Sequence, residues 1–444
     1  MTNPGKKFAI LALFMLSIAI IAGLLASISY LSPEFLKEKI GFSVLRPVHV
    51  SAVYFWISLS ATAGVYSALW NNNMSSFTSK MSYFHFVLIA ISALGILISY
   101  FFKNFGGREY WEYNPYWAIP VLISWVLFLI NYLHSALKIK NWPVYYWMWF
   151  TGILFFIFIF IENYLWLIPS IRESFIKDLT IQWKVNGSIV GAYNQLIYAT
   201  AFYLMDKITD NKAHQVGHKK IVFAMYFLGL ANLMFNWSHH IYTLPSDMYV
   251  KYIGYLVSMT EWVLFLRTIF LWKKTIDEFK INAHYFPYRF LIASEFWVFI
   301  NLFQALLMSI PAINAYTHGT HVTVAHAMGT TIGINTMILL AALYMFFDGK
   351  NDQDSHSHRR YLKNNFWFLQ ISLLFFFLSL DISGVLKGLW QMDKHALPFS
   401  DMMANLHPWF ILMFISGCGL FISLGIYCYY LLSVLLKRIT NYSI

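Results

Sequence analysis

Twelve long apolar segments follow one another along the chain, and only short connections separate them. A helix that crosses a lipid bilayer needs about 20 predominantly apolar residues, and each segment is long enough. The expected spans are 8–30, 45–71, 82–102, 116–135, 145–168, 179–206, 219–243, 250–273, 286–311, 322–347, 365–390 and 405–436. They leave no room for a soluble domain. The sequence therefore predicts an all-α integral membrane protein in which residues 1–444 form one transmembrane domain, a bundle of twelve helices.

Composition and charge agree with a protein whose main contact is the lipid bilayer. Hydrophobic residues make up 59% of the chain and charged residues 11%, which is too apolar for a soluble domain. The net charge of +11 does not indicate nucleic-acid binding, because the basic residues lie in the connections between spans. Cys418 and Cys428 both fall inside the last span, so they predict neither a disulfide framework nor a metal site.

The distribution of Lys and Arg predicts the orientation of the bundle. With the N-terminus inside, the inner connections contain most basic residues: Lys6, Lys7, Lys80, Lys138, Lys140, Lys207, Lys212, Lys219, Lys220, Lys273, Lys274, Lys280, Lys350, Arg359, Arg360, Lys363, Lys437 and Arg438. We therefore expect a multi-pass protein of the inner (cytoplasmic) membrane with both termini in the cytoplasm. No small-x-small cleavage site follows the first apolar run, so we expect that helix to be retained.

Two potential haem ligands stand two residues apart in the tenth span, His326 and Met328. Each helical residue turns by about 100°, so these side chains point to roughly opposite faces. His and Met are both ordinary ligands of haem iron. One membrane helix can thus offer an axial ligand to two different haems. A lone His in an apolar segment is more often a packing residue.

Three further histidines reduce the weight of that simpler interpretation: His49, His239 and His240. In the predicted topology they lie with His326 in the outer third of the bundle. Ionisable groups inside a membrane are costly and mark function by default. Unrelated packing histidines have no reason to share one depth, so we expect a common site.

Local motifs around these histidines occur in a fixed order. They are Arg46-Pro-Val-His49, Trp237-Ser-His-His240, and Thr317-His-Gly-Thr320 followed by Ala325-His326. In this order the chain resembles the catalytic subunit of the haem-copper oxidase superfamily, specifically its nitric oxide reductase branch. The resemblance covers nearly the whole chain and implies the twelve-helix fold of subunit I.

The resemblance also implies roles for these residues. His49 is expected to ligate a low-spin haem b, with Arg46 at a propionate. His326 is expected to be the axial ligand of a high-spin haem b, and His239 with His240 to hold a non-haem metal. Gly107-Arg-Glu109 with Glu112 is similar to an outer-loop motif that carries calcium beside the propionates. Glu261 matches an acid near the active site, and Ser383-Gly-Val-Leu386 matches a motif on helix eleven.

The chain departs from the family at the metal ligands. The family's helix six reads His-x-x-x-Glu-x-x-x-Glu, whereas Asn186, Val190 and Asn194 stand at these positions here. An Asn carbonyl oxygen is a harder ligand than imidazole, so two His plus an oxygen donor suit iron better than copper. Met328 replaces the second His of the family's His-x-His. We expect Met328 to ligate the low-spin haem opposite His49, which raises its potential relative to bis-His ligation; the alternative is an ordinary apolar filler.

The oxygen-reducing branch fits less well. Its helix-six His-Pro-Glu-Val-Tyr pattern is absent, and Gly217-His-Lys-Lys220 occupies the other common place for the redox tyrosine. The inner half of the bundle has Glu295 and no evident chain of acids. Protons can enter from outside, where Glu34, Glu109, Glu112 and Asp178 are candidates, although each is more often a plain loop acid.

Electrons are expected from a separate subunit. The chain begins almost directly at the first span, without the N-terminal extension of quinol-oxidising reductases, and it has no Cys-x-x-Cys-His signature for covalent haem. We therefore expect a membrane-anchored cytochrome c subunit on the outer face.

Four functions remain open. The leading one is reduction of NO with two b-type haems and a non-haem iron. The others are dismutation of NO to N₂ and O₂, a divergent terminal oxidase, and a haem-bearing paralogue that binds or senses NO without turnover.

Overall fold

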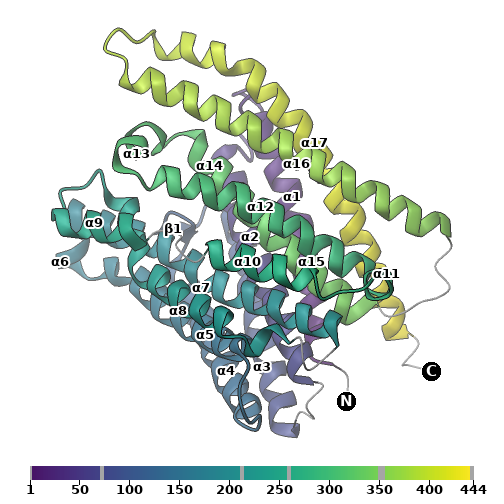
Figure 1. Ribbon diagram of the computed structural model, residues 1–444. Helices are drawn as coiled ribbons and strands as arrows, with labels where there is room; N and C mark the ends of the chain where they lie inside the picture. Colours follow the sequence, from purple (N-terminus) through teal and green to yellow (C-terminus); the bar gives the residue numbers. More distant parts are fainter. Residues whose placement is uncertain (1–2, 71–74, 211–214, 258–261, 349–355, 441–444) are drawn as a thin grey trace.

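The computed structural model describes all residues except 1–2, 71–74, 211–214, 258–261, 349–355 and 441–444, and this part is helical almost throughout (Figure 1). The α-helices are α1 (Gly5–Ile28), α2 (Phe42–Trp70), α3 (Ser76–Phe101), α4 (Ala118–Ala136), α5 (Val144–Asn163), α6 (Pro169–Arg172), α7 (Phe175–Thr209), α8 (Lys220–Phe235), α9 (Met248–Val257), α10 (Trp262–Lys273), α11 (Glu278–Ala283), α12 (Tyr285–Met308), α13 (Pro311–Thr317), α14 (His321–Met328), α15 (Met337–Leu343), α16 (His356–Met392) and α17 (Phe399–Thr440). Short 3-10 helices are η1 (Pro115–Trp117), η2 (Leu165–Leu167), η4 (Val216–His218) and η5 (Asn236–Ile241), and π-helical segments are η6 (Gly329–Thr336) and η7 (Tyr344–Asp348).

Eleven helical stretches in the described residues are long and apolar enough to cross a membrane. They coincide with eleven of the twelve expected spans, and their ends differ from the expected ones by at most about two helical turns. The remaining expected span, 179–206, lies in α7, a helix of 35 residues whose polar side chains include Lys184 and Asn186. The prediction of an all-helical, multi-pass membrane fold is confirmed, whereas eleven of the twelve predicted spans meet the length and hydropathy expected of a membrane helix in the described residues, and α7 stands where the sixth is expected.

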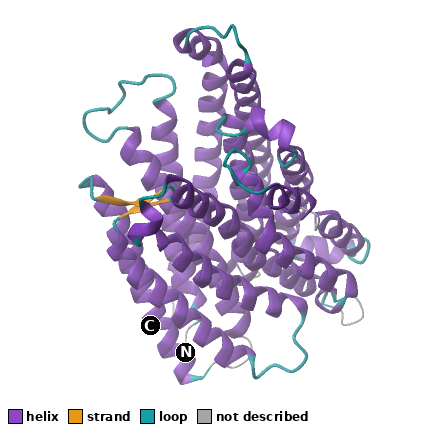
Figure 2. Ribbon diagram, turned by 90° about the vertical axis from the view of Figure 1, so that its left-hand side faces the viewer, coloured by secondary structure: helices purple, strands orange, loops and turns teal. Residues whose placement is uncertain are grey.

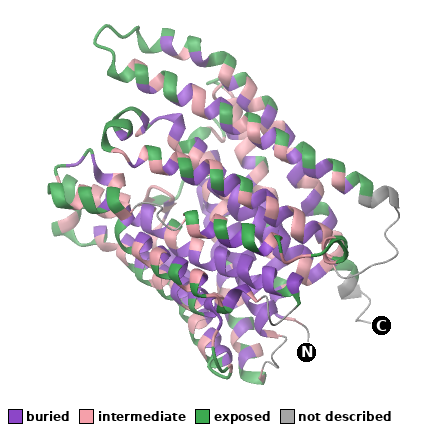
Figure 3. Cartoon of the chain, viewed as in Figure 1, coloured by how far each residue is buried: buried purple, intermediate pink, exposed green. Residues whose placement is uncertain are grey.

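Helix α2 and the segment His321–Asp348 lie at the centre of the bundle. Both are buried over 78% of their most apolar stretch, against 39% for the stretch that contains α4. A helix that is apolar all round is a buried helix, and the buried residues gather around these two elements (Figure 3). The indole N–H groups of two large side chains there are hydrogen-bonded. The Trp56 indole N–H donates to Thr336 Oγ1 at 3.0 Å, and that of Trp297 donates to Gln370 Oε1 at 2.9 Å.

The expected span 322–347 is a helix whose hydrogen-bond pattern changes along its length. It is α-helical to Met328, π-helical over η6, α-helical again over α15, and π-helical over η7. The Thr336 hydroxyl donates to the carbonyl of Thr331, five residues back, at 2.7 Å. Gly333 faces the Trp297 ring so closely that a Cβ atom would overlap it. The wide π turns therefore begin directly after Met328, and such turns often accompany functional sites.

A small hairpin caps the end of the bundle opposite the two chain termini. Strands β1 (Phe105–Arg108) and β2 (Trp111–Tyr113) pair antiparallel and are the only strands in the described residues (Figure 2). Tyr110 has a left-handed backbone with φ of 67°, and a Cβ on Gly107 would overlap the carbonyl of Trp111. The tight turn holds Glu109 and Glu112 near the start of α2. Both termini lie at the other end of the molecule (Figure 1).

Candidate functional site

His239 and His240 lie on η5, the 3-10 turn that ends the span of α8. Their rings stack with centroids 4.3 Å apart and planes inclined by 30°. His326 on α14 lies close enough to both rings to act on them electrostatically. The structure thus brings His326 close to a pair of adjacent histidines that is far from it in the sequence, and a shared site stays a prediction.

Helix α7 approaches this group through a glycine. A Cβ on Gly187 would lie 2.8 Å from Cδ2 and 3.0 Å from Nε2 of His240, so only glycine allows the ring to rest there. The neighbouring residue is Asn186, whose Oδ1 is buried without a hydrogen-bond partner. Other buried amide oxygens, among them those of Asn194 and Asn236, are likewise unpaired, so the position beside the Gly187–His240 contact is what singles out Asn186 as a partner for a metal ion or a polar ligand.

The expected metal ligands are two imidazoles and one amide oxygen. Among the described residues, no three His, Cys, Asp or Glu side chains are grouped closely enough to hold a metal ion. Asn186 stands outside those four residue types, and Glu261 lies outside the described residues. The assignment of a non-haem metal to His239, His240 and Asn186 therefore stays a prediction.

His326 and Met328 occupy the last turn of α14. The His326 carbonyl accepts a hydrogen bond from the Thr330 hydroxyl at 3.1 Å, and the Asn301 backbone approaches the imidazole. The Met328 sulfur lies 4.0 Å from the Thr331 hydroxyl. Both side chains are half-buried. They leave the helix in different directions, which keeps the two-haem interpretation open.

His49 on α2 is fixed by α1. Its Nδ1 lies 2.8 Å from the carbonyl oxygen of Ala19, and because a carbonyl only accepts, Nδ1 carries the proton. Nε2 of the neutral ring then keeps its lone pair, the form that binds a metal. A Cβ on Gly23 would lie 2.6 Å from Nδ1, so Gly23 makes the room for the ring. Sequence reasoning missed Ala19 and Gly23, although a glycine inside an apolar span is a usable signal.

Arg46 binds both acids of the hairpin. Its Nη1 lies 2.7 Å from Glu112 Oε1, and its Nη2 lies 2.9 Å from Glu109 Oε1. Burial raises the pKa of Glu112, and the nearby Arg46 charge opposes the shift. The second carboxylate oxygen, Glu112 Oε2, is buried without a partner, and so is the indole nitrogen of Trp111. The oxygen could accept a cation such as calcium, and the indole N–H could donate to a propionate. Both assignments remain predictions.

Two other candidate acids are engaged in ion pairs. Arg108 binds Asp178 through two hydrogen bonds, of 3.1 and 2.6 Å, and Glu34 pairs with Lys37 at 2.9 Å. Glu295, on the inner side, pairs with Lys273 at 3.0 Å. Each of these acids thus has a structural ion pair, and entry of protons through Glu34 or Asp178 stays a prediction.

One ion pair near the histidines was not anticipated. Lys184 on α7 binds Glu162 on α5, and its ammonium group lies 5.4 Å from the centre of the Trp237 ring. Trp237 also contacts Gly187. Neither Lys184 nor Glu162 belongs to a local motif, so only the packing of α5, α7 and η5 reveals the pair.

An all-helical membrane bundle with histidines gathered inside it is an arrangement expected of membrane proteins that bind haem or metal ions. Residues 3–419 match the family described as cytochrome c and quinol oxidase polypeptide I. The chain belongs to this family, the subunit I of the haem-copper oxidase superfamily, whose members are haem-binding oxidoreductases.

Relatives come from both branches of the superfamily. Cytochrome c oxidase subunit 1 of Rhodobacter capsulatus is 22% identical over 427 residues, covering 90% of this chain and 78% of the relative. A cbb3-type cytochrome c oxidase subunit of Stutzerimonas stutzeri is 22% identical, with coverages of 87% and 85%. A nitric oxide reductase subunit of Stutzerimonas stutzeri is 21% identical over 460 residues, covering 96% of this chain and 93% of the relative.

A solved structure of a haem-copper terminal oxidase dimer has the same fold. It superposes with a TM-score of 0.76 over 98% of this chain and 85% of its own, at 14% identity. These similarities establish the superfamily and the fold. The choice between oxygen and nitric oxide depends on the residues of the site.

The described residues fit haem. His49 presents an unprotonated Nε2, Met328 offers a thioether, and His326 lies beside the His239–His240 pair. His and Met are the ligand types that haem iron takes in proteins.

Proposed function

We propose that the protein reduces nitric oxide to nitrous oxide: 2 NO + 2 e⁻ + 2 H⁺ gives N₂O and H₂O. The main support is the unpaired amide oxygen of Asn186, next to the contact between Gly187 and His240. Two imidazoles and an oxygen form a ligand set that suits iron and is poor for copper. The redox tyrosine motifs of the oxidases are also missing from the sequence.

In this proposal each residue has a defined role. His49 and Met328 hold the low-spin haem b, with Arg46 offsetting the charge of a propionate. His326 holds the high-spin haem b, while His239, His240 and Asn186 hold the non-haem iron. When bound, these groups supply electrons and positive charge in one pocket, where two NO molecules are close enough to couple.

We assign the delivery of protons to Glu261, which lies outside the described residues. The resemblance implies an acid near the site at this position, and the family's two helix-six acids are Val190 and Asn194 here. We expect Glu261→Gln to lower turnover by about 10²-fold or more, the scale of losing a positioned proton donor, with unchanged haem content. Full activity in this variant would make Glu261 a structural acid.

We place the protein in the inner membrane of the cell. The electron donor is a membrane-anchored cytochrome c that docks on the outer face of the bundle. The purified chain should then turn over with a reduced c-type cytochrome or an artificial donor. Turnover with a quinol alone would contradict this assignment.

A divergent terminal oxidase is the second candidate, because two oxidase subunits are 22% identical to the chain. Elemental analysis separates the candidates. We expect iron in excess of haem iron in the wild type, and its loss with retained haem in His240→Ala. His407→Ala is the matched control, because that histidine is exposed on α17. Copper at the site would favour the oxidase, and an empty site would favour an NO-binding paralogue.

A further inference from the structure

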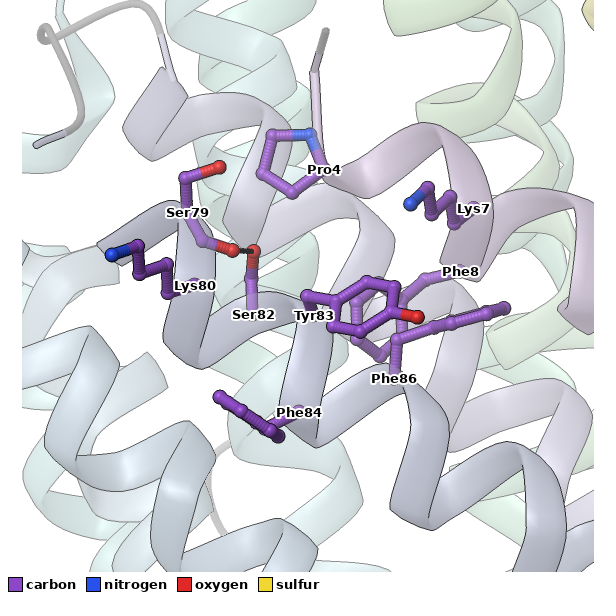
Figure 4. A pocket seen from close by; sticks show the side chains of 9 residues that line it. All are labelled: Pro4, Lys7, Phe8, Ser79, Lys80, Ser82, Tyr83, Phe84 and Phe86. Atoms are coloured by element: carbon purple, nitrogen blue, oxygen red, sulfur yellow. Dashed lines mark hydrogen bonds between the residues drawn. The ribbon is translucent and has the colours of Figure 1, made fainter. Parts of the chain in front are cut away.

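A cavity of about 410 Å³ opens between the first turns of α1 and α3, away from the histidine site. Figure 4 shows Lys7 above the rings of Phe8, Tyr83 and Phe86, and Lys80 on the far side of Ser82 with its ammonium group pointing away from Lys7. The hydroxyl-bearing residues Ser79 and Ser82 line the same cavity. Both helices begin here, so the positive ends of two helix dipoles point toward it.

The positive charge of this cavity is uncompensated. Neither Lys7 nor Lys80 forms an ion pair with a carboxylate among the described residues. The sequence has no Asp or Glu in 1–33 or in 39–108, so no acid from the nearby connection can neutralise them. Neither helix has an acid in its first turn. An anion is the ligand that this environment favours.

The lower wall of the cavity is apolar and faces outward. Tyr83 is 54% and Phe84 58% exposed, on a helix that is apolar enough to span the membrane. Phe86 packs edge-on against Phe8 of α1, with ring centroids 5.4 Å apart, and so ties the two helices together. The Lys7 ammonium group lies 5.0 Å from the centre of the Tyr83 ring. Aromatic rings beside lysines at a helix end are typical of the membrane–water interface.

We propose that this cavity binds the headgroup of an anionic phospholipid from the leaflet next to the chain termini. Lys7 binds the phosphate, Lys80 binds it after turning its side chain inward, the Ser79 hydroxyl donates to it, and the acyl chains run along Phe84. The Ser82 hydroxyl is occupied by the Ser79 carbonyl at 2.7 Å. A free phosphate ion would use the lysines and leave the aromatic wall in water, so the combination of charge and exposed rings favours a lipid. This inference does not depend on the reaction that the protein catalyses.

Lipid retention tests the proposal on the purified whole chain. The protein is reconstituted in nanodiscs with equal phosphatidylglycerol and phosphatidylcholine, extracted into detergent, and weighed by native mass spectrometry. We expect phosphatidylglycerol to be retained in preference, and about tenfold less of it in K7A/K80A. K7R/K80R should retain it. The control K138A/K140A removes two exposed lysines from the connection between α4 and α5, outside the cavity, and should not change retention.

Three results would overturn the proposal. One is equal retention of the two lipids by the wild type. Another is an equal loss in K7A/K80A and K138A/K140A, which would indicate unspecific attraction to the bilayer. The third is displacement of the bound lipid by millimolar inorganic phosphate, which would indicate a simple anion site.

Discussion

At the scale of single residues, the protonation state of His49 follows from one backbone atom. The Ala19 carbonyl fixes the proton on Nδ1 and leaves Nε2 for a metal. The close approach that makes this possible requires Gly23. The sequence identified His49 through its motif, but it could not identify the partner on α1, because that partner is a main-chain oxygen with no side-chain signature.

Gly23→Ala should therefore displace the His49 ring. The added methyl would meet the imidazole at 2.6–2.8 Å, and overpacking of this kind costs about 1–3 kcal/mol. We expect a lower thermal midpoint and a weakened low-spin haem spectrum. Gly425→Ala is the control, since a Cβ there meets nothing within 4 Å. If both variants keep the wild-type spectrum, His49 is not the ligand.

Met328→His tests the other side of the same haem. Replacing a thioether by an imidazole should remove the weak long-wavelength band of ferric His/Met haem and lower the reduction potential. Optical redox titration measures both changes. An unchanged spectrum and potential would show that Met328 is an apolar filler on α14.

At the scale of elements, the length of the apolar segments made the positions of the membrane helices predictable. Spans of about 20 residues fixed the helices within about two turns, because lipid allows little else. The switch to π geometry after Met328 could not be predicted, because it depends on the close contact of Gly333 with Trp297 on another helix. Likewise, the Lys184–Glu162 pair depends on how α5 and α7 are packed.

The stability of the protein should depend on pH through Glu112 in the hairpin β1–β2. Burial raises the pKa of Glu112 despite Arg46, so folding favours the protonated acid. The stability that this acid contributes is present below its ordinary pKa and is lost as the pH rises through the raised one. The thermal midpoint of the wild type relative to Glu112→Gln should thus fall as the pH rises above about 4, the ordinary pKa of Glu. Glu109→Gln is the matched control, because it alters a more exposed acid that binds the same arginine. A relative midpoint that rises with pH would contradict the burial argument.

At the scale of the whole molecule, the two chain ends lie at the same end of the bundle, and the side of the membrane on which that end lies stays a prediction. The Lys- and Arg-rich connections predict cytoplasmic termini, and the structure places both termini at one end (Figure 1). Fluorescent protein fused at the C-terminus should therefore fluoresce in cells. Alkaline phosphatase fused at the same position should be inactive, because that enzyme needs export. The reverse pair of results would show that the bundle has the opposite orientation in the membrane. The electron donor would then have to dock on the other face.

The bundle as a whole brings His326 to His239 and His240, and we propose that NO is reduced there. The direct measurement is mass spectrometry of the gas above purified protein supplied with ¹⁵N-labelled NO and an artificial electron donor. The proposal predicts one ¹⁵N₂O for every two NO consumed, dependence on the donor, and no O₂. Labelled N₂ with O₂ in the absence of a donor would contradict it and indicate dismutation, and consumption of O₂ with no turnover of NO would indicate an oxidase.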